Sequence, residues 1–281
     1  MSLPNFLLIG AYKAGTTSLH RYLREHPSVF MPRLKEPNFF ALEGGGKTPP
    51  HRDHGSDILE YQDYVRLFQG AEDETALGEA SPMYLQSPQA PVRIRHYIPH
   101  ARLLVSLRDP ADAVYSSYVM DVRNGHEERG FSHVLKQLTQ DLTINPAAAP
   151  FYHQQLSRYY ALFPRHQLKV SLYEDLRQEA ASVVRNMYKH LEVDEGFEPD
   201  TRRVANAGAV PRNRKINKLL KRTALGRRIP PRVRKRLSEL NAKPADNLSQ
   251  AHRARLIDLF REDVLYLQDL IQRDLGSWLT A

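Results

Sequence analysis

The feature that most constrains this chain is a strand–loop–helix pattern that begins at its fifth residue. Asn5–Ile9 (NFLLI) is a short apolar run typical of a buried parallel strand. The loop Gly10–Gly15 follows, and a helix is predicted from Thr16 to about His26, where Pro27 stops it. Glycines let a backbone turn tightly around an anion, and the first amides of a helix have no internal partner. The pattern therefore predicts an anion site at the end of a parallel strand.

The rest of the chain alternates apolar strands with helices. Arg102–Leu107 (RLLVSL) and Leu168–Leu172 (LKVSL) are predicted as core strands, with a helix over Pro110–Asn124 between them. Other predicted elements are a strand over 75–78 and helices over 57–68, 88–97, 131–142, 151–163, 176–191 and 249–275. This alternation predicts an α/β fold, a single P-loop-like domain over residues 1–281 with a central parallel β-sheet flanked by helices. Ligands of such sheets bind at the carboxyl ends of the strands.

The positive charge is concentrated in one segment. The formal net charge is +8, and residues 201–236 hold 14 Lys and Arg and no Asp or Glu. We expect the basic, helical C-terminal segment 201–281 to pack on the α/β core. The charge indicates either an anionic partner or a solvated helical surface. Nucleic acid is a poor fit, because the basic stretch lacks the aromatic side chains on which single-stranded bases stack.

Several classes of protein and site are disfavoured by what the sequence lacks. There is no cysteine, which excludes disulfides and thiolate catalysis and fits a cytoplasmic location. No apolar run approaches the roughly 18 residues that cross a bilayer, so no membrane span is expected. His51 and His54 have a spacing seen in metal sites, but no carboxylate arrangement supports them, so no metal is expected.

The first loop differs from that of nucleotide triphosphatases. Those proteins place a lysine directly after the second glycine, whereas here Thr16 stands there and Lys13 precedes Gly15 by two residues. The string KAGTTSL resembles the 5′-phosphosulfate loop of sulfotransferases that use PAPS (3′-phosphoadenosine 5′-phosphosulfate). The resemblance implies that Lys13 stabilises charge on the leaving 5′-phosphate. It also implies that the donor contacts Lys13, Ala14, Gly15, Thr16, Thr17 and Ser18.

A second motif follows the strand Arg102–Leu107. Arg108 opens the string R-D-P and Ser116 follows eight residues later, which resembles the 3′-phosphate motif of the same family. An arginine can grip a phosphate through two parallel hydrogen bonds. Ala113 stands where many members carry a further arginine. The alternative is that Arg108 pairs with a structural carboxylate, Asp109 or Asp112.

Two further segments resemble parts of the donor site. Tyr173 opens the string YEDL, whose tyrosine lies near the adenine in the family. A buried core tyrosine is the alternative. Arg212 and Arg214 lie where the family has a loop that closes over the 3′-phosphate, so the resemblance implies that they bind the cofactor. The family's Gly-rich, Trp-containing form of that loop is absent.

The acceptor side is indicated by two more strings. Glu36 and Phe39 belong to EPNFF, which resembles the E-P-x-F-F segment of glycan sulfotransferases, whose glutamate is the proposed general base. The string GEASPMY resembles a segment that lines the acceptor site, with alanine in place of the usual lysine. The resemblance implies substrate contacts from Glu36, Phe39, Glu79, Ser81 and Tyr84.

Together the resemblances cover most of residues 5–190 and imply a bacterial-type enzyme that transfers a sulfuryl group from PAPS to a hydroxyl group in line. The product is PAP (adenosine 3′,5′-bisphosphate), and no metal is required. An acidic or carrier-bound acceptor would suit the basic segment. Two alternatives stay open from the residues: a P-loop-type nucleotide kinase with Asp109 as its metal-binding acid, and a non-catalytic binder of anions or nucleic acid.

Overall fold

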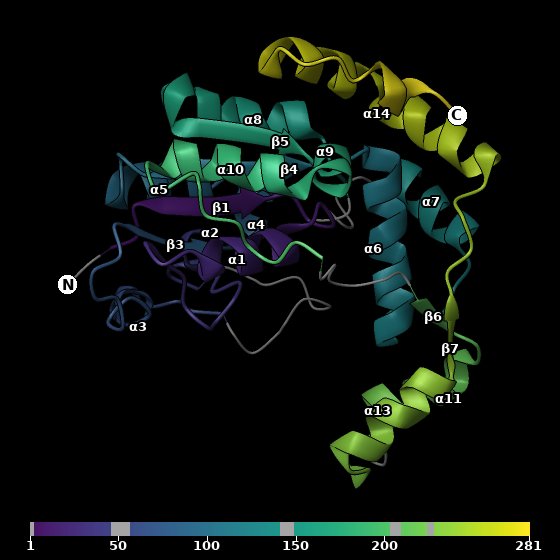
Figure 1. Ribbon diagram of the computed structural model, residues 1–281. Helices are drawn as coiled ribbons and strands as arrows, with labels where there is room; N and C mark the ends of the chain where they lie inside the picture. The colour runs from purple at the N-terminus through teal and green to yellow at the C-terminus, as the bar shows by residue number, and fades with distance from the viewer. Residues whose placement is uncertain (1–2, 46–56, 141–148, 203–208, 224–227) are drawn as a thin grey trace.

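The computed structural model describes residues 3–45, 57–140, 149–202, 209–223 and 228–281 (Figure 1). Its centre is one sheet of five strands, all parallel, in the order β2-β3-β1-β4-β5. The strands are β1 (Phe6–Gly10), β2 (Val29–Phe30), β3 (Ala76–Ala80), β4 (Arg102–Leu107) and β5 (Leu168–Leu172). The predicted α/β fold with a central parallel sheet is confirmed. Because β1 is the middle strand, its carboxyl end lies at the centre of the edge where ligands of such sheets bind.

Helices cover both faces of this sheet, because successive side chains of a strand point to opposite sides. Phe6 and Leu8 of β1 pack on one face with α1 (Thr16–Glu25) and α10 (Ala180–Leu191). Leu7 and Ile9 pack on the other face with the larger part of the core. That face is covered by α2 (Phe39–Leu42), α3 (Tyr61–Arg66), α4 (Met83–Gln86), α5 (Ala90–Tyr97), α6 (Pro110–Asn124), α7 (Phe131–Gln140), α8 (Tyr152–Tyr160) and α14 (Gln250–Ile271).

Helix α6 begins and ends where the sequence predicts. The Asp109 side chain caps it by accepting hydrogen bonds from the amides of Ala111 (2.8 Å) and Asp112 (3.3 Å). Pro110 occupies the first turn, and Gly125 ends the helix with φ of 76°. The helix continues beyond the edge of the sheet (Figure 1) and forms one wall of the main cavity.

One predicted helix is two helices in the structure. The sequence predicts a helix over 176–191, but α9 (Tyr173–Gln178) and α10 are separated at Glu179, whose φ of −141° and ψ of 67° are not helical. Helix α9 starts directly after β5, and its first residue is Tyr173. Tyr173 therefore lies at the carboxyl edge of the sheet because it directly follows β5.

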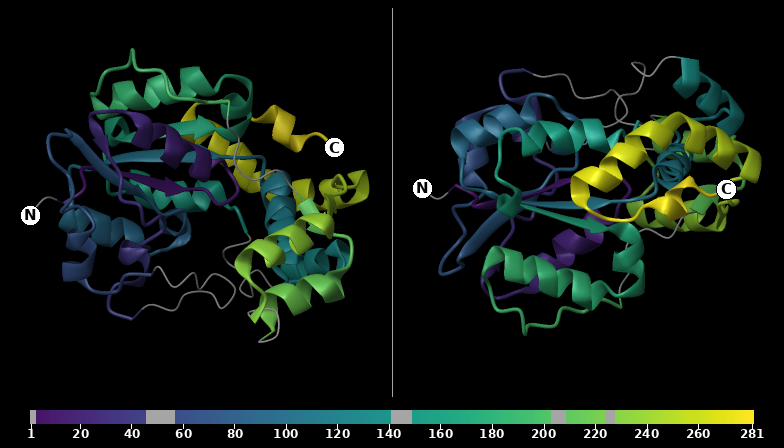
Figure 2. Two further views of the ribbon diagram at one scale, coloured as in Figure 1. Left: turned by 60° about the horizontal axis from the view of Figure 1, so that its bottom comes forward. Right: turned by 90° about the horizontal axis from the view of Figure 1, so that it is seen from above.

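The C-terminal segment contains two structurally different parts. Helix α14 packs on α6 and α8 and buries Leu256 and Phe260 in the core. Before it, β6 (Ala209–Pro211) and β7 (Ala242–Pro244) form an antiparallel pair, which connects α11 (Arg214–Arg222) and α13 (Pro231–Leu240) to the body. These two helices project beyond α6 (Figures 1 and 2). A search of the described helices finds none with the length and apolar character of a membrane span. The organisation of residues 1–281 as a single domain stays a prediction.

Candidate active site

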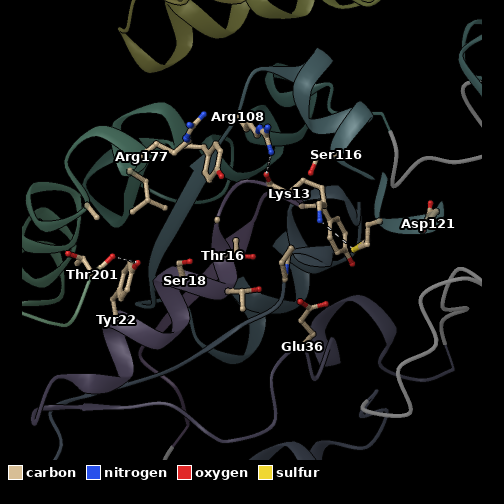
Figure 3. A pocket seen from close by; sticks show the side chains of 18 of the residues that line it. Lys13, Thr16, Ser18, Tyr22, Glu36, Arg108, Ser116, Asp121, Arg177 and Thr201 are labelled. Atoms are coloured by element: carbon tan, nitrogen blue, oxygen red, sulfur yellow. Dashed lines mark hydrogen bonds between the residues drawn. The ribbon is translucent and has the colours of Figure 1, made fainter. Parts of the chain in front are cut away.

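The segments that follow all five strands of the sheet meet at a cavity of about 510 Å³ (Figure 3). Nine of the residues predicted for the site line it: Lys13, Gly15, Thr16, Thr17, Ser18, Glu36, Arg108, Ser116 and Tyr173. They come from the loop and helix after β1, the segment after β2, the start of α6 and the start of α9. Residues distant in the sequence thus converge at the carboxyl edge of the sheet.

The loop after β1 has a backbone that depends on its glycines. Gly15 has φ of 83°, and a Cβ there would lie 2.7 Å from Cδ2 of Leu176 and 3.0 Å from the Tyr173 ring. A side chain at Gly10 would meet Leu85 at 2.6 Å. The N-terminus of α1 carries no side-chain cap, and Gly15, Thr16 and Thr17 line the cavity, so this helix terminus lies where its unpaired amides and dipole favour an anion. The loop therefore fits a phosphate or sulfate group.

Lys13 lies at the turn of this loop, with φ of 65°. Its Nζ donates to Sδ of Met120 on α6 at 3.5 Å, across the cavity wall (Figure 3). A thioether is a weak, neutral acceptor and does not offset the positive charge. Figure 3 shows the Lys13 amine and the Glu36 carboxylate pointing into the same part of the cavity.

Arg108 joins three segments of the site. Its Nη1 donates to the backbone oxygen of Lys13 at 3.1 Å, and its guanidinium lies 4.6 Å from the centre of the Tyr173 ring. Its Nε is buried without a hydrogen-bond partner in the structure. Asp112 approaches the guanidinium only to 3.9 Å. A buried donor without a protein partner is suited to binding an anion.

The two carboxylates that follow Arg108 in the sequence, Asp109 and Asp112, both pair with Arg253. Arg253 of α14 donates to Asp109 at 2.9 Å and also pairs closely with Asp112. Burial raises the pKa of Asp109, and the neighbouring Asp112 charge adds to this, while Arg253 opposes it. Of the two carboxylates proposed as structural partners of Arg108, Asp112 lies within ion-pair distance at 3.9 Å and is shared with Arg253, while Asp109 pairs with Arg253.

Glu36 reaches the cavity from the segment between β2 and α2. Its amide donates to the Ala80 oxygen at 3.1 Å, and its side chain pairs with Lys35. Glu36 has φ of 61° and Asn38 has φ of 56°, a conformation that costs free energy for residues other than glycine. The chain therefore turns sharply on both sides of Pro37.

A buried network holds this turn in place. The Ser81 hydroxyl accepts from the Asn38 amide (3.1 Å) and donates to Oε2 of Glu79 (2.8 Å). The Tyr64 hydroxyl donates to the other Glu79 oxygen at 3.3 Å. Glu79 and Ser81 have no exposed surface. Through the Ser81 bond to the Asn38 amide, this buried pair positions the segment that carries Glu36.

This burial changes the expectation for part of the acceptor site. Phe39 and Tyr84 are also fully buried, and Phe39 stacks on Tyr64 with ring centres 4.5 Å apart. Of the predicted acceptor contacts, only Glu36 lines the cavity, joined by Pro82 from the neighbouring stretch. The side chains of Phe39 in α2, Glu79 in β3, Ser81 directly after β3 and Tyr84 in α4 are all buried in the core and are not exposed in the cavity.

The buried carboxyl group of Glu79 should make the free energy of unfolding depend on pH. Burial raises the pKa of Glu79 from an ordinary 4.5 to about 7, although hydrogen bonds from tyrosine and serine hydroxyls oppose the rise. Between these values the folded protein holds a proton that the unfolded chain releases. The resulting stabilisation is complete below pH 4.5 and is lost as the pH rises through 7, a change of about 3 kcal/mol.

Glu79→Gln should remove that loss, so the free energy of unfolding of the variant should fall less between pH 5 and pH 8 than that of the wild type. Urea unfolding across this range measures it, with the exposed Glu239→Gln on α13 as the matched control. Parallel pH profiles for wild type and Glu79→Gln would show that Glu79 does not carry the effect.

Three predicted donor ligands lie outside the cavity. Ala14 is fully buried, and its carbonyl oxygen accepts from the Ser106 hydroxyl at 2.7 Å. Arg212 and Arg214 line a separate cavity with Tyr115 and Tyr118, on the other side of α6.

The partners of the two arginines explain this position. Arg214 donates to the Arg129 oxygen (2.9 Å) and the Tyr118 hydroxyl (3.1 Å), and Arg212 donates to the Ala242 oxygen (3.1 Å). Helix α6 stands between these arginines and Lys13, so in this conformation they do not reach the donor cavity.

Ten further residues among those described line the cavity without having been predicted, and helical spacing could have found four of them. Met120 and Asn124 follow Ser116 at intervals of four on α6, Tyr22 follows Ser18 on α1, and Arg177 follows Tyr173 on α9. The remaining ones are Tyr12, Pro82, Asp121, Leu176, Ala180 and Thr201. Thr201 lies beyond α10 and carries no sequence signal that separates it from its neighbours.

Among residues 3–45, 57–140, 149–202, 209–223 and 228–281, no three His, Asp or Glu side chains cluster as metal ligands. His51 and His54 lie outside the described residues.

Comparison with known proteins identifies the family of this chain. Residues 4–199 match the model of the sulfotransferase family. The crystal structure of a sulfotransferase from Alicyclobacillus acidocaldarius superposes with a TM-score of 0.77 and 30% identity, covering 99% of both chains. Human bifunctional heparan sulfate N-deacetylase/N-sulfotransferase 3 is 28% identical over 205 residues, 68% of this chain and 22% of the relative. Human carbohydrate sulfotransferase 15 is 32% identical over 152 residues, 42% of this chain and 27% of the relative.

The chain thus spans about a quarter of the length of these two curated relatives. The family match covers the sheet, the loop after β1, α6 and α9, which are the elements that build the cavity. The resemblance inferred from the motifs is therefore confirmed, and this chain belongs to the sulfotransferase family.

Proposed function

We propose that this protein transfers the sulfuryl group of PAPS to a hydroxyl group of its acceptor, releasing PAP. The observation that carries the proposal is the convergence of an anion loop, an arginine with a buried unpaired donor and a carboxylate in one cavity. These residues fit the donor. The amides of α1 and Lys13 suit its 5′-phosphosulfate, while Arg108 and Ser116 suit its 3′-phosphate.

The reaction needs one bond to form and one to break. The acceptor oxygen bonds to sulfur as the bond between sulfur and the bridging oxygen of the 5′-phosphate breaks. Glu36 takes the acceptor proton, and Lys13 stabilises the negative charge that appears on the leaving phosphate. Because Glu36 and Lys13 point into the same part of the cavity, both can act on one reacting centre (Figure 3).

The kinase alternative fits less well. It needs a carboxylate near the phosphates to hold a metal, and Asp109 was its candidate. Asp109 is instead committed to the α6 cap and to Arg253. The acceptor proposal stays broad: a hydroxylated molecule, with an acidic or carrier-bound one favoured by the charge of residues 201–236.

The first test is calorimetric titration with PAP, 5′-AMP and ATP with magnesium. PAP should bind, and affinity should fall when the 3′-phosphate is missing. Arg108→Ala should weaken PAP binding by roughly ten- to a hundredfold, the usual effect of losing charge-assisted hydrogen bonds, and should affect 5′-AMP much less.

Arg185→Ala on α10, outside the cavity lining, is the matched control. A preference for ATP with magnesium would favour the kinase. Equal affinity of wild type and Arg108→Ala for PAP would remove the 3′-phosphate role of Arg108.

A further inference from the structure

Helices α11 and α13 form a surface that the proposed chemistry does not use. We call residues 214–222 and 231–240 the basic arm. It carries nine Lys and Arg and one carboxylate, Glu239. It projects beyond α6, away from the sheet (Figures 1 and 2). Helix α13 buries none of its residues. A ten-residue helix is marginal by itself in water, so an uncovered helix of this length gains stability from whatever covers it.

The arm also exposes apolar side chains to an unusual degree. Ten large apolar residues are exposed among the described residues, and the arm holds five of them: Ile216, Leu219, Val233, Leu237 and Leu240. Leu240 is 71% exposed. Single exposed apolar residues are ordinary, but a cluster on one projecting element marks an interaction site.

On α13 the apolar side chains form one stripe along the helix and the basic side chains flank it. At 100° per residue, Val233, Leu237 and Leu240 share one narrow stripe along the helix. Arg232 and Arg236 fall on one side of the stripe, and Arg234 falls on the other. Cations that flank an apolar stripe are typical of helices that lie in the interface of a lipid bilayer.

The arm is anchored where it would influence the cavity. The Asn217 side chain donates to the Val122 oxygen (3.2 Å), and Lys221 Nζ donates to the Arg123 oxygen (2.6 Å), at the end of α6. Helix α6 lines the cavity through Met120 and Asn124. A surface bound to the arm would therefore lie near the helix that forms the cavity wall.

We propose that the basic arm binds the surface of an anionic lipid bilayer, with its apolar stripe in the headgroup region and its arginines at the phosphates. A polyanionic chain would engage the cations and leave five apolar side chains exposed to water, whereas an anionic bilayer satisfies both. A projecting, convex element also suits a broad surface. The proposal is independent of the transfer chemistry.

Vesicle co-sedimentation tests it with the full chain. The protein should bind vesicles of phosphatidylcholine with phosphatidylserine, and should bind vesicles of phosphatidylcholine alone much more weakly. Reversing three charges with Arg232→Glu, Arg234→Glu and Arg236→Glu should lower partitioning by at least on the order of a hundredfold. Raising the salt concentration should weaken wild-type binding.

The apolar stripe has its own test. Val233→Ser with Leu237→Ser should lower partitioning, while Val92→Ser with Leu265→Ser, which removes equally exposed side chains elsewhere, should not. Arg185→Glu, Arg255→Glu and Arg261→Glu match the charge change outside the arm. Unchanged unfolding midpoints would show that all variants fold.

Two results would overturn the proposal: no binding of wild type to phosphatidylserine vesicles at low salt, or equal loss of binding in the arm and control variants. Weak vesicle binding beside tight, arm-dependent binding to an acidic protein or glycan would assign the arm to that partner instead. Neither result bears on PAP binding, which reports separately on the transferase proposal.

Discussion

Replacing Glu36 with glutamine should lower turnover by about a hundredfold to ten-thousandfold while PAP binds as it does to the wild type. Glutamine keeps the size of the side chain and leaves untouched the amide that donates to the Ala80 oxygen. It cannot accept the proton that the acceptor must lose. The structure favours this carboxylate because the backbone holds it at an unfavourable φ of 61°, over a buried network that fixes the turn.

The matched control is Glu43→Gln, because Glu43 also pairs with a cation, Arg93 at 3.4 Å, but lies outside the cavity lining. Single-turnover rates with saturating donor separate chemistry from binding. Near-normal rates in Glu36→Gln would end the general-base assignment. Asp121 would then be the next candidate, since it is the other carboxylate among the described residues that line the cavity.

The fold was predictable because the signal is local. Strands covered on both faces are short apolar runs, and β4, with five of its six residues buried, has the predicted bounds for this reason. The edge strand β5 also has the predicted bounds, although only its first and last residues are buried. Glycine, lysine and arginine placed directly after such strands must then meet at one edge of the sheet. This accounts for the correct placement of Lys13 and Arg108 in one cavity.

The acceptor side was harder to predict because a motif does not reveal which of its side chains face inward. Glu79 lies near the end of β3 and Ser81 directly follows it, much as Arg108 follows β4, yet β3 lies between β1 and β2 and is covered on both faces. Ser81 donates a hydrogen bond to Glu79 and accepts one from the amide of Asn38, in the segment that carries Glu36. Only the tertiary packing distinguishes a polar pair that supports a site from one that contacts the substrate.

The positions of Arg212 and Arg214 depend on long-range packing. They follow a stretch of about twenty residues after α10, and their place is set by the pairing of β6 with β7 and by contacts with α6. That pairing is antiparallel and involves strands of three residues, which the sequence pattern did not predict. The basic character of the segment was evident, whereas the side of α6 on which it lies was not.

Replacing Lys13 with alanine should lower turnover by about a hundredfold to a thousandfold, the usual effect of removing one donor that stabilises developing charge. The loop backbone that follows Lys13 should survive, because Gly15 and the Arg108 bond to the Lys13 carbonyl oxygen do not involve the lysine side chain. PAP affinity should fall less than turnover does, since the α1 amides and Arg108 still hold the nucleotide. Lys189→Ala, exposed on α10, is the control.

Comparing the change in kcat with the change in KM for Lys13→Ala tests the role of the Lys13 side chain. If Lys13 acts on the leaving phosphate, kcat should carry most of the loss, because the charge it stabilises appears only as the bond to sulfur breaks. If Lys13 only attracts the donor, KM should rise and kcat should persist. The geometry favours the first result, because the Lys13 amine and the Glu36 carboxylate point into the same part of the cavity, where the proposal places the reacting centre (Figure 3).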